Sequence, residues 1–201
     1  MQYIRVGWVS GIVTQQKNMM FMQYRRSQTK GGSFFFTIVA HERQKILCHD
    51  ENAALINEAF QRVTLKYPFD IDAFVLLPDH IHCIWTLPRG DDDFSTRWRL
   101  IKSYFTKGCR DEYKNVLTLS RSRKNEQAIW QRRFWEHTIR DENDFSRHVD
   151  YIHYNPVRHG LAKSPREWPH SSFHQYVKRG IYDFNWGSGE KIEFEEHIGE
   201  E

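Results

Sequence analysis

The chain has 201 residues, of which 39% are hydrophobic and 27% are charged, and its formal net charge is +3. This length suits one compact domain with short appendages, and this composition excludes wholesale disorder. No stretch approaches the roughly 20 apolar residues that a membrane-spanning helix needs, and the first residues lack a secretory cleavage signature, so we expect a cytoplasmic protein.

The first half of the chain predicts one helix and three strands. Aromatic and β-branched residues follow the turn signal KGGS and predict a strand over 33–40. Apolar residues at helical spacing predict a helix that begins near Asp50 and ends before Pro68. Two further apolar runs, 69–77 and 80–87, flank a Pro-Asp turn and predict a hairpin.

The second half predicts two helices and one strand. The segment GDDDF supplies N-caps for a helix over about 95–109, and the polar, basic stretch 110–128 indicates a loop. Residues 128–139 predict a strand, and Asp141 or Asn143 begins a helix that we expect to end before Pro156. The order β-α-β-β-α-β-α predicts an α+β fold: a ferredoxin-like (RRM-like) antiparallel sheet backed by two helices, with one further helix.

Charge is distributed unevenly along the chain. Residues 97–133 contain eleven basic and three acidic residues, whereas residues 181–201 contain seven acidic residues and one lysine. Aromatic residues interleave with the basic ones, a pattern typical of single-stranded nucleic-acid binding. The alternative is a solvated helix face with core aromatics. The three cysteines are too widely spaced to indicate a disulfide framework or a thiolate metal site.

Two histidines lie in the otherwise apolar strand 80–87. Because side chains alternate along a strand, His80 and His82 share one face with Ile84, while the opposite set is apolar and predicts the core face. Their Cα atoms are expected about 6–7 Å apart. Such a pair can bind one metal ion or one phosphate; the alternative is a solvated or hydrogen-bonded structural pair.

The last helix offers further candidates. Tyr151 and Asn155 are four residues apart and share one helix face, with His148 close to that face. Asn155 precedes Pro156, so we expect it at or near the end of the helix. A tyrosine is a candidate nucleophile and an amide oxygen is a candidate metal ligand, although packing and capping are the commoner roles of such a pair.

Several linked motifs carry a resemblance to a known family. LLPDHIHCIWTLP, GDDDFSTRW, IWQRRFWEHTIRDENDF, HVDYIHYNPVRHGL and EWPHSSFH occur in unbroken order between about Tyr24 and Trp186. This chain resembles the REP-associated tyrosine transposases, bacterial relatives of the single-tyrosine HUH transposases of small insertion sequences. The first 21 residues have no counterpart in that pattern, so we predict an extension over 1–21, a transposase domain over 22–180 and an acidic tail over 181–201.

The resemblance implies a chemistry and a site. His80 and His82 would bind a divalent cation, Mg²⁺ or Mn²⁺, with Asn155 as the third ligand, and Tyr151 would be the nucleophile. The implied reaction is metal-dependent cleavage and strand transfer of single-stranded DNA through a covalent 5′-phosphotyrosine intermediate. His148 is a secondary candidate for positioning, and His153 and His159 are expected to be structural or to face DNA.

The resemblance also implies the partner. The expected substrate is single-stranded or hairpin DNA containing REP-like palindromes, bound by a cytoplasmic, nucleoid-associated protein with no nucleotide cofactor. We expect a monomer, with a dimer as the alternative. The predicted DNA contacts are Arg97, Arg99, Lys102, Trp130, Arg132 and Arg133, although a core role for the aromatic residues remains open. The alternative functions are a hairpin-binding protein that does not cut and a zinc-dependent hydrolase.

Overall fold

A computed structural model describes residues 31–114, 129–189 and 191–194. The predicted extension 1–21, most of the predicted loop 110–128 and the end of the acidic tail lie outside these residues. No helix in the described ranges is long and apolar enough to cross a membrane. The elements are β1 (Ser33–Val39), η1 (His41–Arg43), α1 (Asp50–Lys66), β2 (Asp70–Leu76), β3 (His80–Thr86), α2 (Phe94–Gly108), η2 (Asp111–Tyr113), β4 (Trp135–Thr138), α4 (Glu142–Arg158), η3 (Pro165–Glu167) and α5 (Phe173–Lys178).

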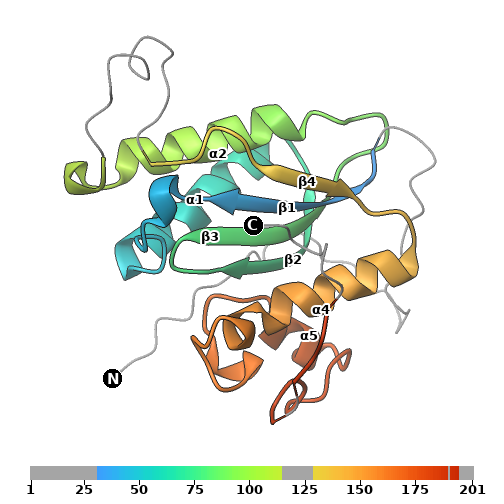
Figure 1. Ribbon diagram of the computed structural model, residues 1–201. Helices are drawn as coiled ribbons and strands as arrows, with labels where there is room; N and C mark the ends of the chain where they lie inside the picture. The colour runs from blue at the N-terminus through green and yellow to red at the C-terminus, as the bar shows by residue number, and fades with distance from the viewer. Residues whose placement is uncertain (1–30, 115–128, 190, 195–201) are drawn as a thin grey trace.

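The four strands form one antiparallel sheet in the order β2-β3-β1-β4 (Figure 1). β1 and β3 are the central strands, and their register pairs Thr37 with His82 and Val39 with His80. With the helical connections β1-α1-β2 and β3-α2-β4, this order is the ferredoxin-like arrangement. The predicted α+β class and the hairpin of β2 and β3 are therefore confirmed.

Two predicted boundaries are wrong. The strand predicted over 128–139 is shorter: β4 begins at Trp135, and Trp130 makes only an isolated bridge with Ala40. The helix that was expected to end before Pro156 is α4, which continues to Arg158, and the amide of His159 donates to the carbonyl of Asn155 over 3.0 Å. Burial of every residue from Tyr151 to Pro156 outweighs the local restriction that proline imposes.

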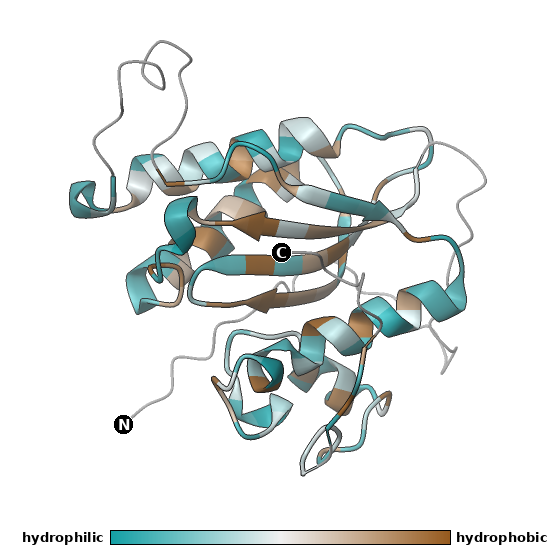
Figure 2. Ribbon diagram, viewed as in Figure 1, coloured by the Kyte–Doolittle hydropathy of each residue, from teal (hydrophilic) through white to brown (hydrophobic). Residues whose placement is uncertain are grey.

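The sheet has two covered faces. Alternate strand residues, including Phe36, Cys83 and Trp85, pack with α1 and α2 in the larger core. The other residues, including Phe35, Val75 and Ile84, pack with α4 and α5 in a second core. Figure 2 shows hydrophobic residues along the strands and at intervals along the helices. α4 thus covers the sheet face opposite α1 and α2. His80 and His82 lie on the face that α4 covers.

The beginning of the predicted acidic tail takes part in this second core. The hydroxyl of Tyr182 hydrogen-bonds Asp150 of α4, and its ring stacks on Phe173 and on Trp186. Tyr182 and Trp186 therefore pack against α4 and α5.

A buried carboxylate fastens the start of α4 to the edge of the sheet. The Asp144 carboxylate is 2.8 Å from His137 Nε2 on β4 and accepts a hydrogen bond from the Arg140 amide over 2.9 Å. Burial alone would raise the pKa of Asp144, but these hydrogen bonds and the nearby charge of His137 lower it to about 2. Asp141 caps the same helix by accepting from the Asp144 amide.

Asp144→Asn should therefore destabilise the protein in a pH-dependent way. The folded-state pKa of about 2 lies below the ordinary aspartate value of 3.8, so the carboxylate stabilises the folded state above about pH 4 and loses this effect as the pH falls toward 2. We expect the variant to lose about 1–2 kcal/mol of unfolding free energy at pH 7, after allowance for solvent screening. Urea titrations at pH 7 and pH 3 measure it, with the exposed Glu142→Gln as control. An equal loss at both pH values would contradict this explanation.

Candidate active site

Both predicted histidines are buried beneath α4. His80 is 1% exposed and His82 is 0% exposed, and their ring centroids are 4.7 Å apart. Alternation along β3 directs Ile81, Cys83 and Trp85 into the core beneath α1 and α2, as the sequence predicts. The imidazoles are therefore not on a solvated face, because α4 covers them.

Each imidazole is held through its Nδ1 atom. His80 Nδ1 lies 2.6 Å from the carboxylate of Asp79, and His82 Nδ1 lies 3.0 Å from the hydroxyl of Thr37. Asp79 is partly buried, which raises its pKa, but the hydrogen bonds and charges of His80 and Arg43 lower it overall. A carboxylate bonded to Nδ1 orients a histidine so that Nε2 offers its lone pair to a metal ion.

The phenol of Tyr151 lies beside these histidines. The Tyr151 ring centroid is 5.2 Å from that of His82, and the side chain is 1% exposed. Its hydroxyl accepts a hydrogen bond from Arg158 Nη1 over 2.8 Å. The ring also contacts Phe35 of β1 and Phe194, with centroids 6.1 and 5.5 Å away. Packing of α4 on the sheet therefore brings residues 82 and 151 together.

Asn155 lies one helical turn beyond Tyr151 and is 0% exposed. Within the described ranges, neither its Oδ1 nor its Nδ2 has a hydrogen-bond partner, which is costly for a buried amide. A buried amide oxygen that lacks a donor, on the helix that covers two neighbouring imidazoles, fits a divalent cation. His159, one turn further, is exposed at the surface and has its ring centroid 5.3 Å from that of His80.

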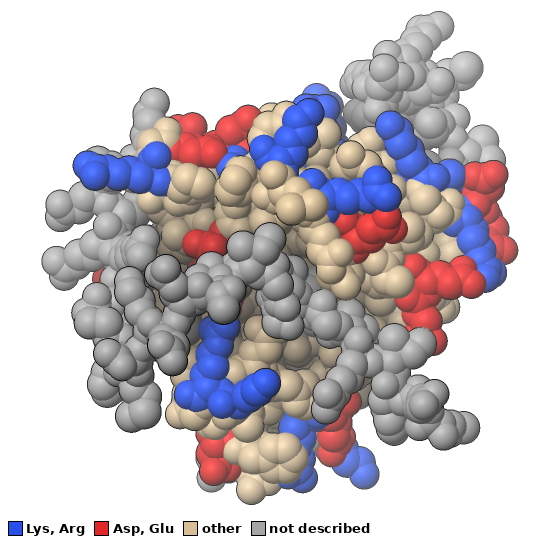
Figure 3. Space-filling view, turned by 180° about the vertical axis from the view of Figure 1, so that it is seen from behind, with Lys and Arg blue, Asp and Glu red and all other residues tan. Residues whose placement is uncertain are grey.

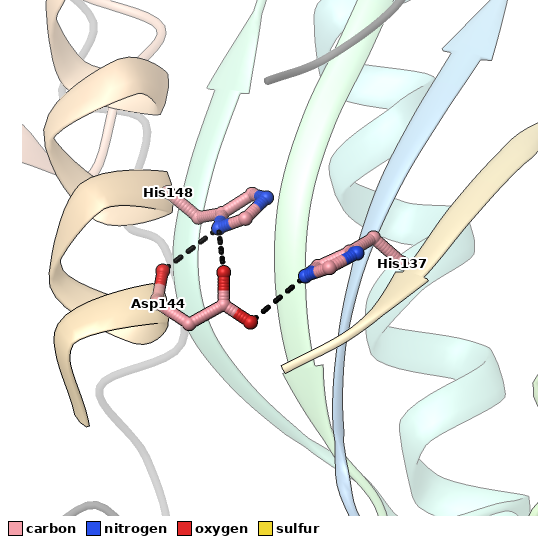
Figure 4. A group of neighbouring side chains, drawn as sticks. All are labelled: His137, Asp144 and His148. Atoms are coloured by element: carbon pink, nitrogen blue, oxygen red, sulfur yellow. Dashed lines mark hydrogen bonds and ion pairs between the residues drawn. The ribbon is translucent and has the colours of Figure 1, made fainter. Parts of the chain in front are cut away.

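A second group of potential ligands lies where β4 meets the start of α4 (Figure 4). His137, Asp144 and His148 offer ligand atoms within 4.8 Å of one another, an arrangement compatible with a metal ion. However, His148 Nδ1 lies 2.7 Å from the carbonyl oxygen of Asp144, an acceptor that requires a proton on that nitrogen. Because His148 Nδ1 is occupied in this way and the Asp144 carboxylate is bonded to His137 and to the Arg140 amide, we interpret this group as a hydrogen-bonded connection between helix and sheet.

The other histidines on α4 have separate environments. His148 stacks on His137 and contacts Phe35, which also contacts Tyr151. Burial, with the charge of His174, lowers the pKa of His153 to about 3. His153 Nε2 lies 2.8 Å from the Ser172 hydroxyl, an arrangement typical of a structural histidine.

Two of the predicted DNA contacts, Arg97 and Trp130, need correction. Arg97 is 2% exposed, and its guanidinium is bonded to the Asp91 carboxylate and to the carbonyls of Tyr67, Pro68 and Asp93. Trp130 is 3% exposed and packs against Phe105, so the alternative core role is confirmed for it. Lys102 is half-buried above Trp130, and burial lowers its pKa to about 8. Arg97 and Trp130 therefore support the fold, and Lys102 stays a predicted DNA contact.

The basic segment is not a uniform positive surface in the described part of the chain. Arg110 pairs with Glu51 and Glu112, and Lys114 pairs with Asp111. On the face in Figure 3, Lys and Arg side chains lie in separate groups, and acidic side chains adjoin some of them. The remaining predicted contacts, Arg99, Arg132 and Arg133, are exposed.

Sequence reasoning missed several residues around the site. Asp79 directly precedes His80 in the sequence and bonds its Nδ1 atom. This adjacency could have indicated a carboxylate that supports the histidine. Thr37 is far away in sequence and is found only through the pairing of β1 with β3. Arg158 lies seven residues, or two helical turns, after Tyr151. The predicted helix ended before Pro156, so Arg158 was not expected on the same helix as Tyr151.

Comparisons with known proteins identify the class to which this fold and these residues belong. The model of the family "Transposase IS200 like" matches residues 14–155. The REP-associated tyrosine transposase of Escherichia coli K12 is 45% identical over 172 residues, which is 86% of this chain and 94% of that protein. A putative REP-associated tyrosine transposase of Haemophilus influenzae is 44% identical over 182 residues, covering 87% of this chain and 98% of the relative.

A solved structure agrees with these relatives. A REP-associated tyrosine transposase bound to a REP hairpin has a TM-score of 0.68 and 42% identity, covering 90% of this chain and 98% of the other. This chain therefore belongs to the IS200-like transposases and, within them, to the REP-associated tyrosine transposases.

Arg97 should contribute to the stability of the fold and not to DNA binding. Arg97→Gln leaves Asp91 and several carbonyls without their donor, so we expect the free energy of unfolding to fall by about 2–3 kcal/mol. The exposed neighbour Arg99→Gln should change it by no more than about 0.5 kcal/mol. Urea denaturation of both variants measures the difference. An Arg97→Gln protein as stable as the wild type but weak in binding hairpin DNA would restore the DNA-contact interpretation.

Proposed function

We propose that this protein cleaves single-stranded DNA at palindromic REP-like hairpins and rejoins it through a covalent 5′-phosphotyrosine on Tyr151. The observation that carries the proposal is the position of the buried Tyr151 ring, 5.2 Å from the ring of His82 and on the helix that covers the His80–His82 pair. The relative bound to a REP hairpin supports the substrate class. The protein would act as a monomer on DNA in the cytoplasm, close to the nucleoid.

The transfer step conserves one phosphodiester linkage. Tyr151 Oη attacks the phosphorus and loses its proton to solvent, an Oη–P bond forms, and the P–O3′ bond breaks. The departing 3′ oxygen takes up a proton, and the 5′ phosphate of the other fragment stays on the protein. A 3′ hydroxyl can later attack this phosphotyrosine, which restores the DNA linkage and releases the phenol without a nucleotide cofactor.

The chain's own residues would prepare the site for this step. His80, His82 and Asn155 would hold a divalent cation, Mg²⁺ or Mn²⁺, with Asp79 and Thr37 orienting the two imidazoles. When bound, the cation supplies positive charge that polarises a non-bridging phosphate oxygen. Helix α4 carries both Tyr151 and Asn155, so one rigid element positions the nucleophile and a ligand together.

The exposed arginines are proposed DNA contacts of lower specificity. Arg99 on α2 and Arg132 and Arg133 before β4 are exposed and would bind phosphates of the hairpin. Phosphate contacts position the nucleic acid but carry no sequence information. Their loss should weaken binding to all hairpins alike.

A denaturing gel tests the proposed chemistry. Wild-type protein, Mn²⁺ and a 3′-labelled single-stranded REP hairpin should give label at the mass of the protein, because the 3′ fragment keeps the 5′ phosphotyrosine. Tyr151→Phe should abolish this adduct and leave DNA affinity within about twofold, since only one hydroxyl is lost. Tyr154→Phe removes a hydroxyl from the same helix and should leave the adduct intact.

The other outcomes separate the alternative functions. Free cleaved product without an adduct would indicate a hydrolase, and bound but uncut oligonucleotide would indicate a hairpin-binding protein that does not cut. Either result, or an adduct that persists in Tyr151→Phe, would contradict the proposal.

The proposed metal ligands can be tested without DNA. Asp79→Asn removes the carboxylate that holds His80 Nδ1, so we expect Mn²⁺ affinity to fall about 10–100-fold. Calorimetric titration of the folded protein with Mn²⁺ measures it, and Asp92→Asn, an exposed aspartate in the loop before α2, is the matched control. Equal affinities of the two variants would mean that His80 is not a ligand.

A further inference from the structure

Arg158 reaches back along α4 to the oxygen of Tyr151. The two residues are seven positions, or two helical turns, apart, so their side chains lie on one face of the helix. Arg158 Nη1 donates to Tyr151 Oη over 2.8 Å, and the guanidinium carbon is 5.3 Å from the centre of the phenol ring. The hydrogen bond is made to Tyr151 Oη, the atom that would attack phosphorus. The Tyr151 side chain is 1% exposed.

We propose that Arg158 is a catalytic residue that stabilises negative charge on Tyr151 Oη during strand transfer. The inference rests on the proposed function, because it assigns a group to the nucleophile of that reaction. A phenol ionises with a pKa near 10 in water, so little of it is a phenolate at neutral pH. A hydrogen-bond donor with a fixed positive charge at the oxygen favours the charged form.

The chemistry of arginine restricts what this residue does. A guanidinium stays protonated in proteins, so Arg158 cannot take the phenol proton, which passes to solvent. When Oη attacks phosphorus, Arg158 stabilises the charge that the oxygen carries as its proton leaves. In the return step the Oη–P bond breaks as a 3′ hydroxyl attacks, and the same donor stabilises the departing phenolate. Loss of Arg158 should therefore slow adduct formation and adduct resolution alike.

The surroundings of Tyr151 leave Arg158 able to do this. Among the described residues, the His82 ring of β3 lies across from the Tyr151 ring at 5.2 Å, and Phe35 and Phe194 supply apolar contacts. Arg158 is itself exposed, so its other N–H groups can reach phosphate oxygens once phosphorus is bonded to Oη. Arginine is suited to this geometry because its planar fork matches phosphate.

Single-turnover kinetics test the assignment. With saturating 3′-labelled hairpin and Mn²⁺, Arg158→Gln should form the adduct about 100-fold more slowly than wild type, as for the loss of one preorganised donor to a developing oxyanion. Arg158→Lys keeps a charge without the fork and should recover part of the rate. Arg147→Gln removes an exposed arginine from the same helix and serves as the charge-matched control.

A merely structural role would give a different pattern. Binding of uncut hairpin, measured in a Tyr151→Phe background, and thermal unfolding should change equally little in Arg158→Gln and Arg147→Gln. If the two variants also form and resolve the adduct at equal rates, or if Arg158→Gln loses only affinity, the assignment is overturned. Should Arg158→Gln fail to fold, Arg158→Lys decides by the same rates of adduct formation and resolution.

The same experiment separates a failure of the proposed function from a failure of the Arg158 assignment. No adduct with wild-type protein, or an adduct that survives Tyr151→Phe, removes Tyr151 as the nucleophile whatever Arg158 does. An adduct that requires Tyr151 but forms at the wild-type rate in Arg158→Gln overturns this inference alone.

Discussion

The site depends on the burial of β3 on both of its faces. One set of alternate side chains packs beneath α1 and α2, and the other set, which includes His80 and His82, lies beneath α4. Buried imidazoles are unfavourable unless their nitrogens are bonded, and Asp79 and Thr37 meet this need at Nδ1. The helix that excludes water from the histidines also carries Tyr151 and Asn155. Packing of α4 on the sheet therefore also brings the candidate site residues together.

Much of the fold could be predicted because its signals are local. Alternation, turn residues and helical spacing indicate β1, α1, the hairpin of β2 and β3, and α2. The errors arise where tertiary packing overrides a local preference. Pro156 lies inside α4 because the buried face of that helix extends to it. The ladder of β4 with β1 covers only Trp135–Thr138, and Gln131 donates to the carbonyl of Val39 as a separate contact. The pairing of β1 with β3, which places Thr37 against His82, has no local signal.

The candidate site was less predictable than the fold. His80, His82, Tyr151 and Asn155 were suggested by residue type and spacing, and the structure places them on facing elements. Charge alone was misleading: Arg97 is a buried residue that joins α2 to the end of α1, and Trp130 belongs to the core. Composition cannot distinguish a phosphate contact from a buried ion pair, because both need the same guanidinium. Arg158 escaped notice because it lies beyond the proline that was expected to end the helix.

In the proposed site the divalent cation binds between β3 and α4, where the Tyr151 side chain lies. Anomalous diffraction from a crystal of the protein soaked in Mn²⁺ tests it most directly, because the structure contains two groups that could hold a metal ion. We predict one strong anomalous peak bonded to His80, His82 and Asn155. A peak only at His137, Asp144 and His148, or no ordered Mn²⁺ at either group, would contradict it.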